Sequence, residues 1–81
     1  MTHYTRADLE TAERHVAQGE QHVARQEELL TVMRTRAQPT ESAEALLTLF
    51  NSTLVEHRAH RDAIAKALDA RGQQQPRGDT L

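Results

Sequence analysis

The sequence predicts an all-α protein in which two long helices fold back on each other as an antiparallel hairpin. Two observations predict this fold. Apolar residues recur in alternating steps of three and four along two stretches of the chain, and one short proline-containing break separates these stretches. Helices of equal length joined by a short break pack antiparallel. We expect residues 1–72 to form the hairpin and the polar residues 73–81, which contain Pro76 and Gly78, to form a disordered tail.

The first helix is expected over residues 6–36. Thr5 is a good N-cap residue, and Asp8, at the third helical position, suits the positive end of the helix dipole. No proline interrupts this stretch, and it contains a single glycine. The apolar stripe resembles a heptad seam that skips only Gln26, and it consists of Leu9, Ala12, Val16, Gly19, Val23, Leu30 and Met33.

A turn is expected over residues 37–40, followed by a second helix over residues 41–71. Pro39 disfavours helical geometry at the residue before it, and Thr40 can cap the helix that follows. Gly72 is expected just past the end of this helix, where glycine commonly terminates helices. The second stripe, again in steps of three and four, consists of Leu47, Phe50, Leu54, His57, Arg61, Ile64 and Leu68.

The two stripes meet in one register if the turn is centred near residue 38 or 39. The facing pairs are then Leu30 with Leu47, Val23 with Leu54, Leu9 with Leu68, Gly19 with His57, and Val16 with Arg61. In this register the half of the hairpin near the turn is rich in apolar residues, whereas the half away from the turn has few apolar residues and is mostly polar.

More apolar residues lie near the turn than one helix–helix seam can bury. Leu29, Val32, Leu46 and Leu49 fall off the two stripes and should stay exposed in a lone hairpin. Two-fold homodimers are the commonest way to cover such a surface. The sequence therefore predicts a homodimer whose turn-proximal halves form a four-helix bundle, with a different protein as the alternative partner.

Composition excludes several classes of site and partner. The 81 residues include no cysteine, which excludes disulfides and cysteine-based zinc sites. A net charge of −2 gives no general attraction for nucleic acid or anionic membranes. No run approaches the ~20 apolar residues of a membrane span, and the N-terminal stretch does not resemble a signal peptide. We therefore expect a cytoplasmic protein with no membrane partner.

Histidines are the residues most suited to a specific site, since there are five of them. The candidate metal ligands are His15 and His22 on one face of the first helix, His57 and His60 on one face of the second, and Glu20 or Glu56 nearby. The favoured interpretation is that they are ordinary polar helix residues, some of them half-buried. Neither Glu-x-x-His nor His-Glu-x-x-His occurs, so no metal, cofactor-binding or catalytic residue is assigned.

Nucleic-acid binding and catalysis have little support. The available arginines are Arg25, Arg34, Arg36, Arg58 and Arg61. Acidic residues are interleaved with them, so a solvated face of ion pairs is favoured over a nucleic-acid surface. A phospho-accepting histidine within residues 56–64 would need the proline spacing of a histidine-kinase dimerisation box and an ATP-binding domain, which the sequence lacks. No phosphate-binding glycine loop and no nucleophile–base–acid set occurs, so the chain is not expected to be an enzyme.

Two segments, AERHVAQGEQHVARQEELL (residues 12–30) and HRAHRDAI (residues 57–64), carry a resemblance to a family. The chain resembles a group of short, uncharacterised helical proteins of rhizobia and related alphaproteobacteria, which pair E-x-H-[IV]-A-R-Q with a downstream H-x-x-H-R-D. The matching residues are Glu20, His22, Val23, Ala24, Arg25 and Gln26, then His57, His60, Arg61 and Asp62. The resemblance implies a helical hairpin and a bacterial source, and it implies no activity or ligand.

Together these observations predict a small, non-catalytic interaction or regulatory protein that acts by binding protein. The alternative is a metal- or pH-responsive helical bundle that uses the histidine-rich half of the hairpin.

Overall fold

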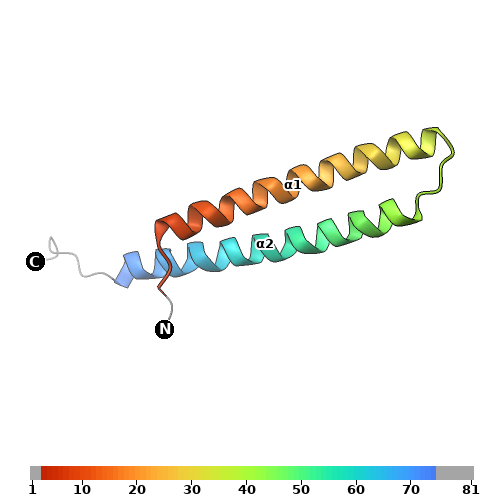
Figure 1. Cartoon of the computed structure of the whole chain (residues 1–81). Coiled ribbons are helices and arrows are strands. Elements are labelled where there is room, and N and C mark those ends of the chain that lie inside the picture. The colour runs from red at the N-terminus through yellow and green to blue at the C-terminus, as the bar shows by residue number, and fades with distance from the viewer. Residues whose placement is uncertain (1–2, 75–81) are drawn as a thin grey trace, which may run out of the picture.

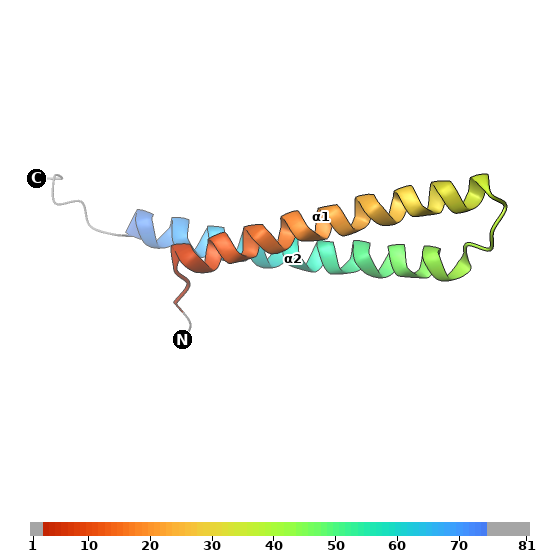
Figure 2. The same ribbon diagram turned by 45° about the horizontal axis from the view of Figure 1, so that its top comes forward.

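The structure, a computed structural model, describes residues 3–74 and contains two helices, α1 (Arg6–Thr35) and α2 (Glu41–Gln74). Figures 1 and 2 show the two helices side by side and running in opposite directions, with the chain reversing between them. The described residues include no strand. The predicted all-α helical hairpin is therefore confirmed.

A reciprocal pair of hydrogen bonds fixes the start of α1. The Asp8 backbone N–H donates to Thr5 Oγ1 at 3.1 Å, and the Thr5 backbone N–H donates to Asp8 Oδ2 at 2.8 Å. This is a capping box, which satisfies two backbone donors that would otherwise lack partners at a helix start. The prediction that Thr5 caps the helix is confirmed, and Asp8 contributes a direct bond as well as its charge.

The end of α1 is a Schellman-type cap built without glycine. The Gln38 N–H donates to the Met33 carbonyl at 2.9 Å, and the Ala37 N–H donates to the Arg34 carbonyl at 3.1 Å. This geometry requires a left-handed residue at position 37, and Ala37 adopts it with φ of 54°. The helix ends at Thr35, one residue before the predicted end, and Pro39 lies in the connection that follows.

The second helix begins where predicted and ends later. The Thr40 hydroxyl donates to the Glu44 carboxylate, and the Glu44 N–H donates to the Thr40 carbonyl at 2.8 Å. The prediction that α2 ends at Arg71 with Gly72 as a terminating residue is wrong, because α2 continues through Gly72 to Gln74. A helical glycine costs only about 1 kcal/mol, which does not by itself end a helix. The predicted tail thus begins with two helical residues, and residues 75–81 lie outside the described part.

The seam between α1 and α2 contains the predicted stripes. Every residue of both stripes is buried or half-buried. The most buried residues are Ala12, Val16, Gln26 and Leu30 on α1 and Ala43, Leu54 and Ile64 on α2. The polar gap in the first stripe is therefore part of the core: Gln26 is only 6% exposed, and its Nε2 donates to the Ala43 carbonyl at 2.9 Å.

The register differs from the predicted one by about one helical turn. Leu54 lies against Gly19, one turn before the predicted partner Val23, and the His57 ring lies beside His15 instead of Gly19. The reason is the connection between the helices. After the cap at residue 37 the chain runs back beside the end of α1 before α2 begins at Glu41 (Figure 1), so the first turn of α2 does not face the last turn of α1.

Candidate functional site

Two edges flank the buried seam, and one of them carries ion pairs. Arg58 Nη2 lies 3.1 Å from Glu20 Oε2, and Arg34 Nη2 lies 3.9 Å from Glu44 Oε2. Residues fourteen apart share a face of a helix in a heptad repeat, so both pairs lie along the same edge, which we call the ion-pair edge. All four side chains are about half exposed, and such pairs contribute at most about 1 kcal/mol each. Arg34 and Arg58, two of the five arginines considered for nucleic-acid binding, thus form solvated ion pairs with acidic residues of the other helix.

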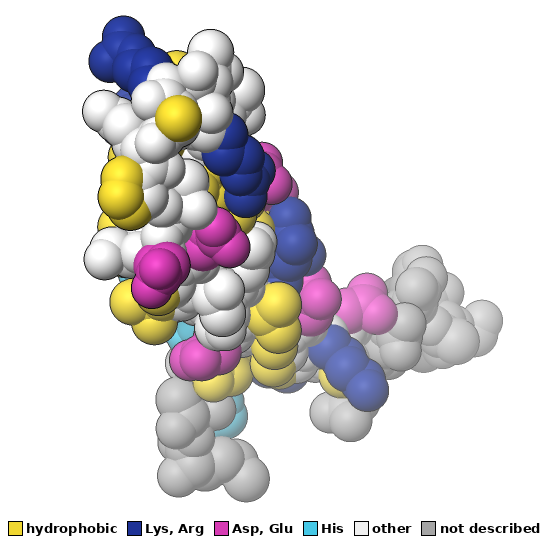
Figure 3. All heavy atoms as spheres, turned by 90° about the vertical axis from the view of Figure 1, so that its right-hand side faces the viewer, with side chains coloured by type: hydrophobic (Ala, Val, Ile, Leu, Met, Phe, Trp, Pro, Cys, Tyr) yellow, Lys and Arg dark blue, Asp and Glu magenta, His cyan; other side chains and the backbone are white. Residues whose placement is uncertain are grey.

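The opposite side of the hairpin near the turn carries exposed apolar residues. These are Leu29, Val32, Leu46 and Leu49, with 47%, 44%, 40% and 58% of each residue exposed, and we call them the apolar face. Figure 3, which looks onto the turn, shows hydrophobic side chains exposed among polar ones at this end of the molecule. The prediction that these four residues lie off the seam is confirmed.

The heptad spacing places three of the histidines on the same side of the hairpin as the apolar face. His15 and His22 precede Leu29 by fourteen and seven residues, so they share its row on α1, and His60 follows Leu46 by fourteen residues on α2. The same side of the hairpin therefore changes from apolar near the turn to histidine-rich towards the other end. We call this second part the histidine edge.

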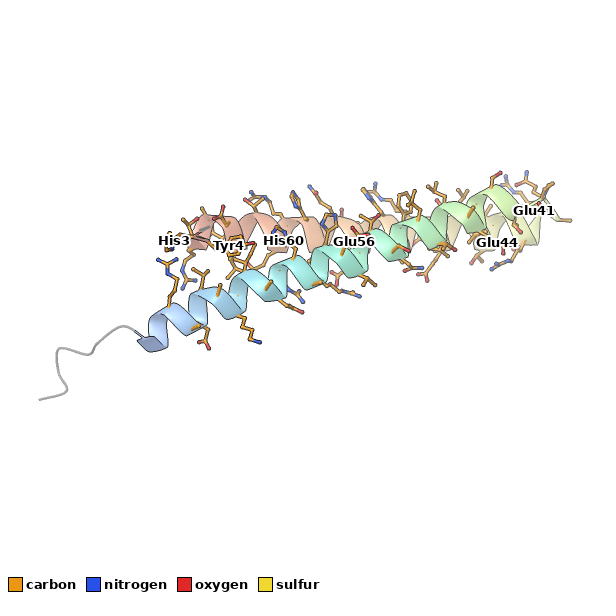
Figure 4. All side chains as sticks on the ribbon, turned by 90° about the horizontal axis from the view of Figure 1, so that it is seen from below. His3, Tyr4, Glu41, Glu44, Glu56 and His60 are labelled. Atoms are coloured by element: carbon orange, nitrogen blue, oxygen red, sulfur yellow. The ribbon has the colours of Figure 1, made fainter. Side chains whose placement is uncertain are left out.

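The structure brings the candidate histidines into three separate ring contacts. His15 and His57 face each other across the seam with ring centroids 5.3 Å apart and planes tilted by 49°. His22 instead lies 5.4 Å from the Phe50 ring, and His60 lies 6.1 Å from the Tyr4 ring (Figure 4). His57 is half-buried, and the other three histidines are exposed.

The glutamates considered as further ligands do not complete a metal site. Glu20 is engaged with Arg58, and Glu56 is exposed on the surface of α2. Among residues 3–74, no three His, Cys, Asp or Glu side chains are grouped so that they could hold a metal ion together. The four candidate histidines therefore do not form one cluster. His15 and His57 contact each other, whereas His22 contacts Phe50 and His60 contacts Tyr4.

An open pocket of about 260 Å³ lies at the end of the hairpin away from the turn. Its lining consists of Tyr4, Asp8, Thr11, Ala12, His15, His60 and Ile64. Arg71 Nη1 donates to the Tyr4 carbonyl and holds the segment before α1 against α2. The Asp8 carboxylate is used by the capping box, and the Thr11 hydroxyl accepts a hydrogen bond from Arg14.

The sequence did not predict that Tyr4 lines this pocket. The residue precedes the first helix and belongs to no periodic stripe, so no spacing signal indicated where its ring would pack. Its contact with His60 depends on how the segment before α1 crosses to α2, which only the three-dimensional arrangement shows.

No helix in the described part of the chain is long and apolar enough to cross a membrane. No protein-family model matches the chain, and comparisons with curated proteins and with solved structures give no significant match.

Proposed function

We propose that this protein is a non-catalytic interaction module that acts by binding protein, and that its partner at the apolar face is a second copy of the same chain. The observation that carries the proposal is the exposure of Leu29, Val32, Leu46 and Leu49 beside a seam that buries other apolar residues. Apolar patches of this kind usually mark interfaces.

The spacing of the apolar face suits a bundle of four helices. Leu29 and Val32 are three residues apart on α1, and Leu46 and Leu49 are three apart on α2. Each helix therefore carries a short second stripe in addition to the one buried in the hairpin. Helices with two stripes pack against two neighbours, as the helices of a four-helix bundle do.

Energetics favour covering this surface. Burying the exposed remainder of one such side chain gains roughly 1 kcal/mol, and a two-fold dimer buries eight of them. Association also costs translational and rotational freedom, so the gain must come from several residues at once. A two-helix chain with only Tyr4 and Phe50 as aromatics has little core of its own, so a dimer would also supply stability.

The test is the mass of the purified full-length chain in solution. We expect a dimer in sedimentation equilibrium at tens of micromolar, and Leu29→Glu combined with Leu49→Glu should convert it to a monomer. The matched control is Val55→Glu, because Val55 is 63% exposed but lies three residues before Arg58, near the ion-pair edge. The control should leave the dimer intact.

A folded monomer of the wild-type chain at these concentrations would contradict self-association. It would leave the same apolar face as the contact surface of a different protein. Equal dissociation by the Val55 variant would show that the dimer forms through another side of the hairpin.

A further inference from the structure

The His15–His57 pair differs from the other two histidine contacts because it brings two imidazoles together across the helices, with their planes tilted by 49°. His15 comes from α1 and His57 from α2, and their ring centroids are 5.3 Å apart. The partners of His22 and His60 in their ring contacts are aromatic hydrocarbon or phenol rings. Of these three contacts, only the first supplies two nitrogen ligands for one metal ion.

The spacing of the pair suits metal chelation. Histidine nitrogens bind Zn²⁺ at about 2.0–2.1 Å with tetrahedral angles, which puts the centroids of two imidazoles on one ion about 5 Å apart. The observed centroid distance of 5.3 Å is close to this value, and rotation of the exposed His15 side chain can bring one of its nitrogens to a point shared with a nitrogen of His57.

We propose that His15 and His57 bind one divalent late first-row transition metal ion, which clamps α1 to α2 at the histidine edge. Imidazole is a preferred ligand of Zn²⁺, Ni²⁺ and Cu²⁺, and hard cations such as Mg²⁺ prefer oxygen. Water occupies the remaining coordination positions, because this chain contributes two ligands. The proposal goes beyond protein binding and does not depend on the dimer.

Access and charge around the pair fit a dication. His15 is exposed and lines the open pocket, so an ion can reach the site from solvent, whereas the half-buried His57 is held by the seam. Two arginines close to His57 in sequence are compensated by acidic partners: Arg58 by Glu20 at 3.1 Å, and Arg61 by Asp62 at 2.9 Å. Their charges therefore oppose a bound dication less than unpaired arginines would.

The test measures thermal unfolding of the full-length chain, freed of metal by chelation, as ZnSO4 or MgSO4 is added. We expect Zn²⁺ to raise Tm by about 5 °C or more for each tenfold increase above its Kd, and Mg²⁺ to have no effect. Equilibrium dialysis should give one Zn²⁺ per chain at saturation. Sedimentation should give the same mass with and without Zn²⁺, because both ligands come from one chain.

Variants separate this pair from the other histidines. His15→Ala and His57→Gln should each abolish the rise in Tm, whereas His22→Ala, the matched control one heptad away on the same row, should keep it. His15 is exposed, so its replacement leaves the fold intact even if a change at His57 weakens the seam. No rise in the wild-type chain, a rise retained in His15→Ala, or a mass that increases only with Zn²⁺ would overturn the proposal.

Discussion

Leu54 of α2 packs directly onto the backbone of Gly19 in α1. A Cβ atom added at Gly19 would lie 3.0 Å from Leu54 Cδ1 and 3.6 Å from Leu54 Cβ, and Leu54 itself is buried. The absence of a side chain at position 19 therefore allows the two helices to approach closely in the middle of the seam. This contact also shows which turn of α1 faces which turn of α2.

Replacing Gly19 with a large side chain should destabilise the hairpin. Gly19→Leu forces the helices apart at Leu54, and we expect a loss of about 1–3 kcal/mol in the free energy of unfolding, measured by urea denaturation. Gly19→Ala should lie within about 0.5 kcal/mol of wild type, because the gain in helix propensity of up to about 1 kcal/mol is offset by the shift required of one Leu54 methyl group.

Gly72 is the control for this series. It is also helical, but nothing lies within 4 Å of the position that its Cβ would take. Gly72→Leu should therefore leave stability unchanged or raise it slightly. A destabilisation equal to that of Gly19→Leu would contradict the assignment of the loss to the contact with Leu54.

The sequence predicts which faces of the two helices meet, but not which turns. A stripe in steps of three and four repeats every seven residues, so sliding one helix by about a turn still brings apolar residues to the seam. The predicted pairing of Val23 with Leu54 relied on a turn centred near residue 38. The actual register depends on the cap at Ala37, where no glycine marks the left-handed residue.

The left-handed conformation of Ala37 gives the second prediction. An L-residue other than glycine pays roughly 1–2 kcal/mol for this backbone region, and Ala37 has φ of 54°. Ala37→Gly should therefore stabilise the hairpin by about 1 kcal/mol, measured by urea denaturation. The same substitution at the exposed, mid-helix Ala24 should have the opposite sign and cost about 1 kcal/mol. A loss of stability in both variants would show that residue 37 is not left-handed in solution.

The features beside the seam were predictable to different degrees. The excess of apolar residues follows from counting positions on a helix, and Leu29 and Leu49 are exposed as that count predicts. The Glu20–Arg58 pair joins the two helices, so counting positions on one helix does not predict it. The contact of His15 with His57 needs the register, which the sequence does not supply. The homodimer, the protein partner, the cytoplasmic location and membership of the alphaproteobacterial family stay predictions.

Gln26 fills the gap in the first stripe, and its removal gives the third prediction. Gln26→Ala deletes a buried hydrogen bond to the Ala43 carbonyl and leaves a cavity, which should cost about 1–3 kcal/mol. Gln26→Leu keeps the volume and should lie within about 1.5 kcal/mol of wild type. The exposed Gln18 is the control, since Gln18→Ala removes the same side chain from the surface of α1 and should change stability by less than about 0.5 kcal/mol. Equal losses of stability in Gln18→Ala and Gln26→Ala would contradict a contribution of the buried Gln26 amide to stability.

The last prediction uses concentration to test whether the apolar face is coupled to folding. If two chains unfold together from a four-helix bundle, Tm must rise with protein concentration, because dilution favours the separated unfolded chains. For two chains of 81 residues, the usual unfolding enthalpy per residue gives a rise of about 4 °C for each tenfold increase in concentration. The Leu29→Glu, Leu49→Glu variant should lose this dependence and melt at a lower temperature, whereas Val55→Glu should keep it. A wild-type Tm that does not change over a hundredfold range of concentration would mean that the hairpin folds by itself, and the exposed leucines would then contribute nothing to its stability as a purified chain.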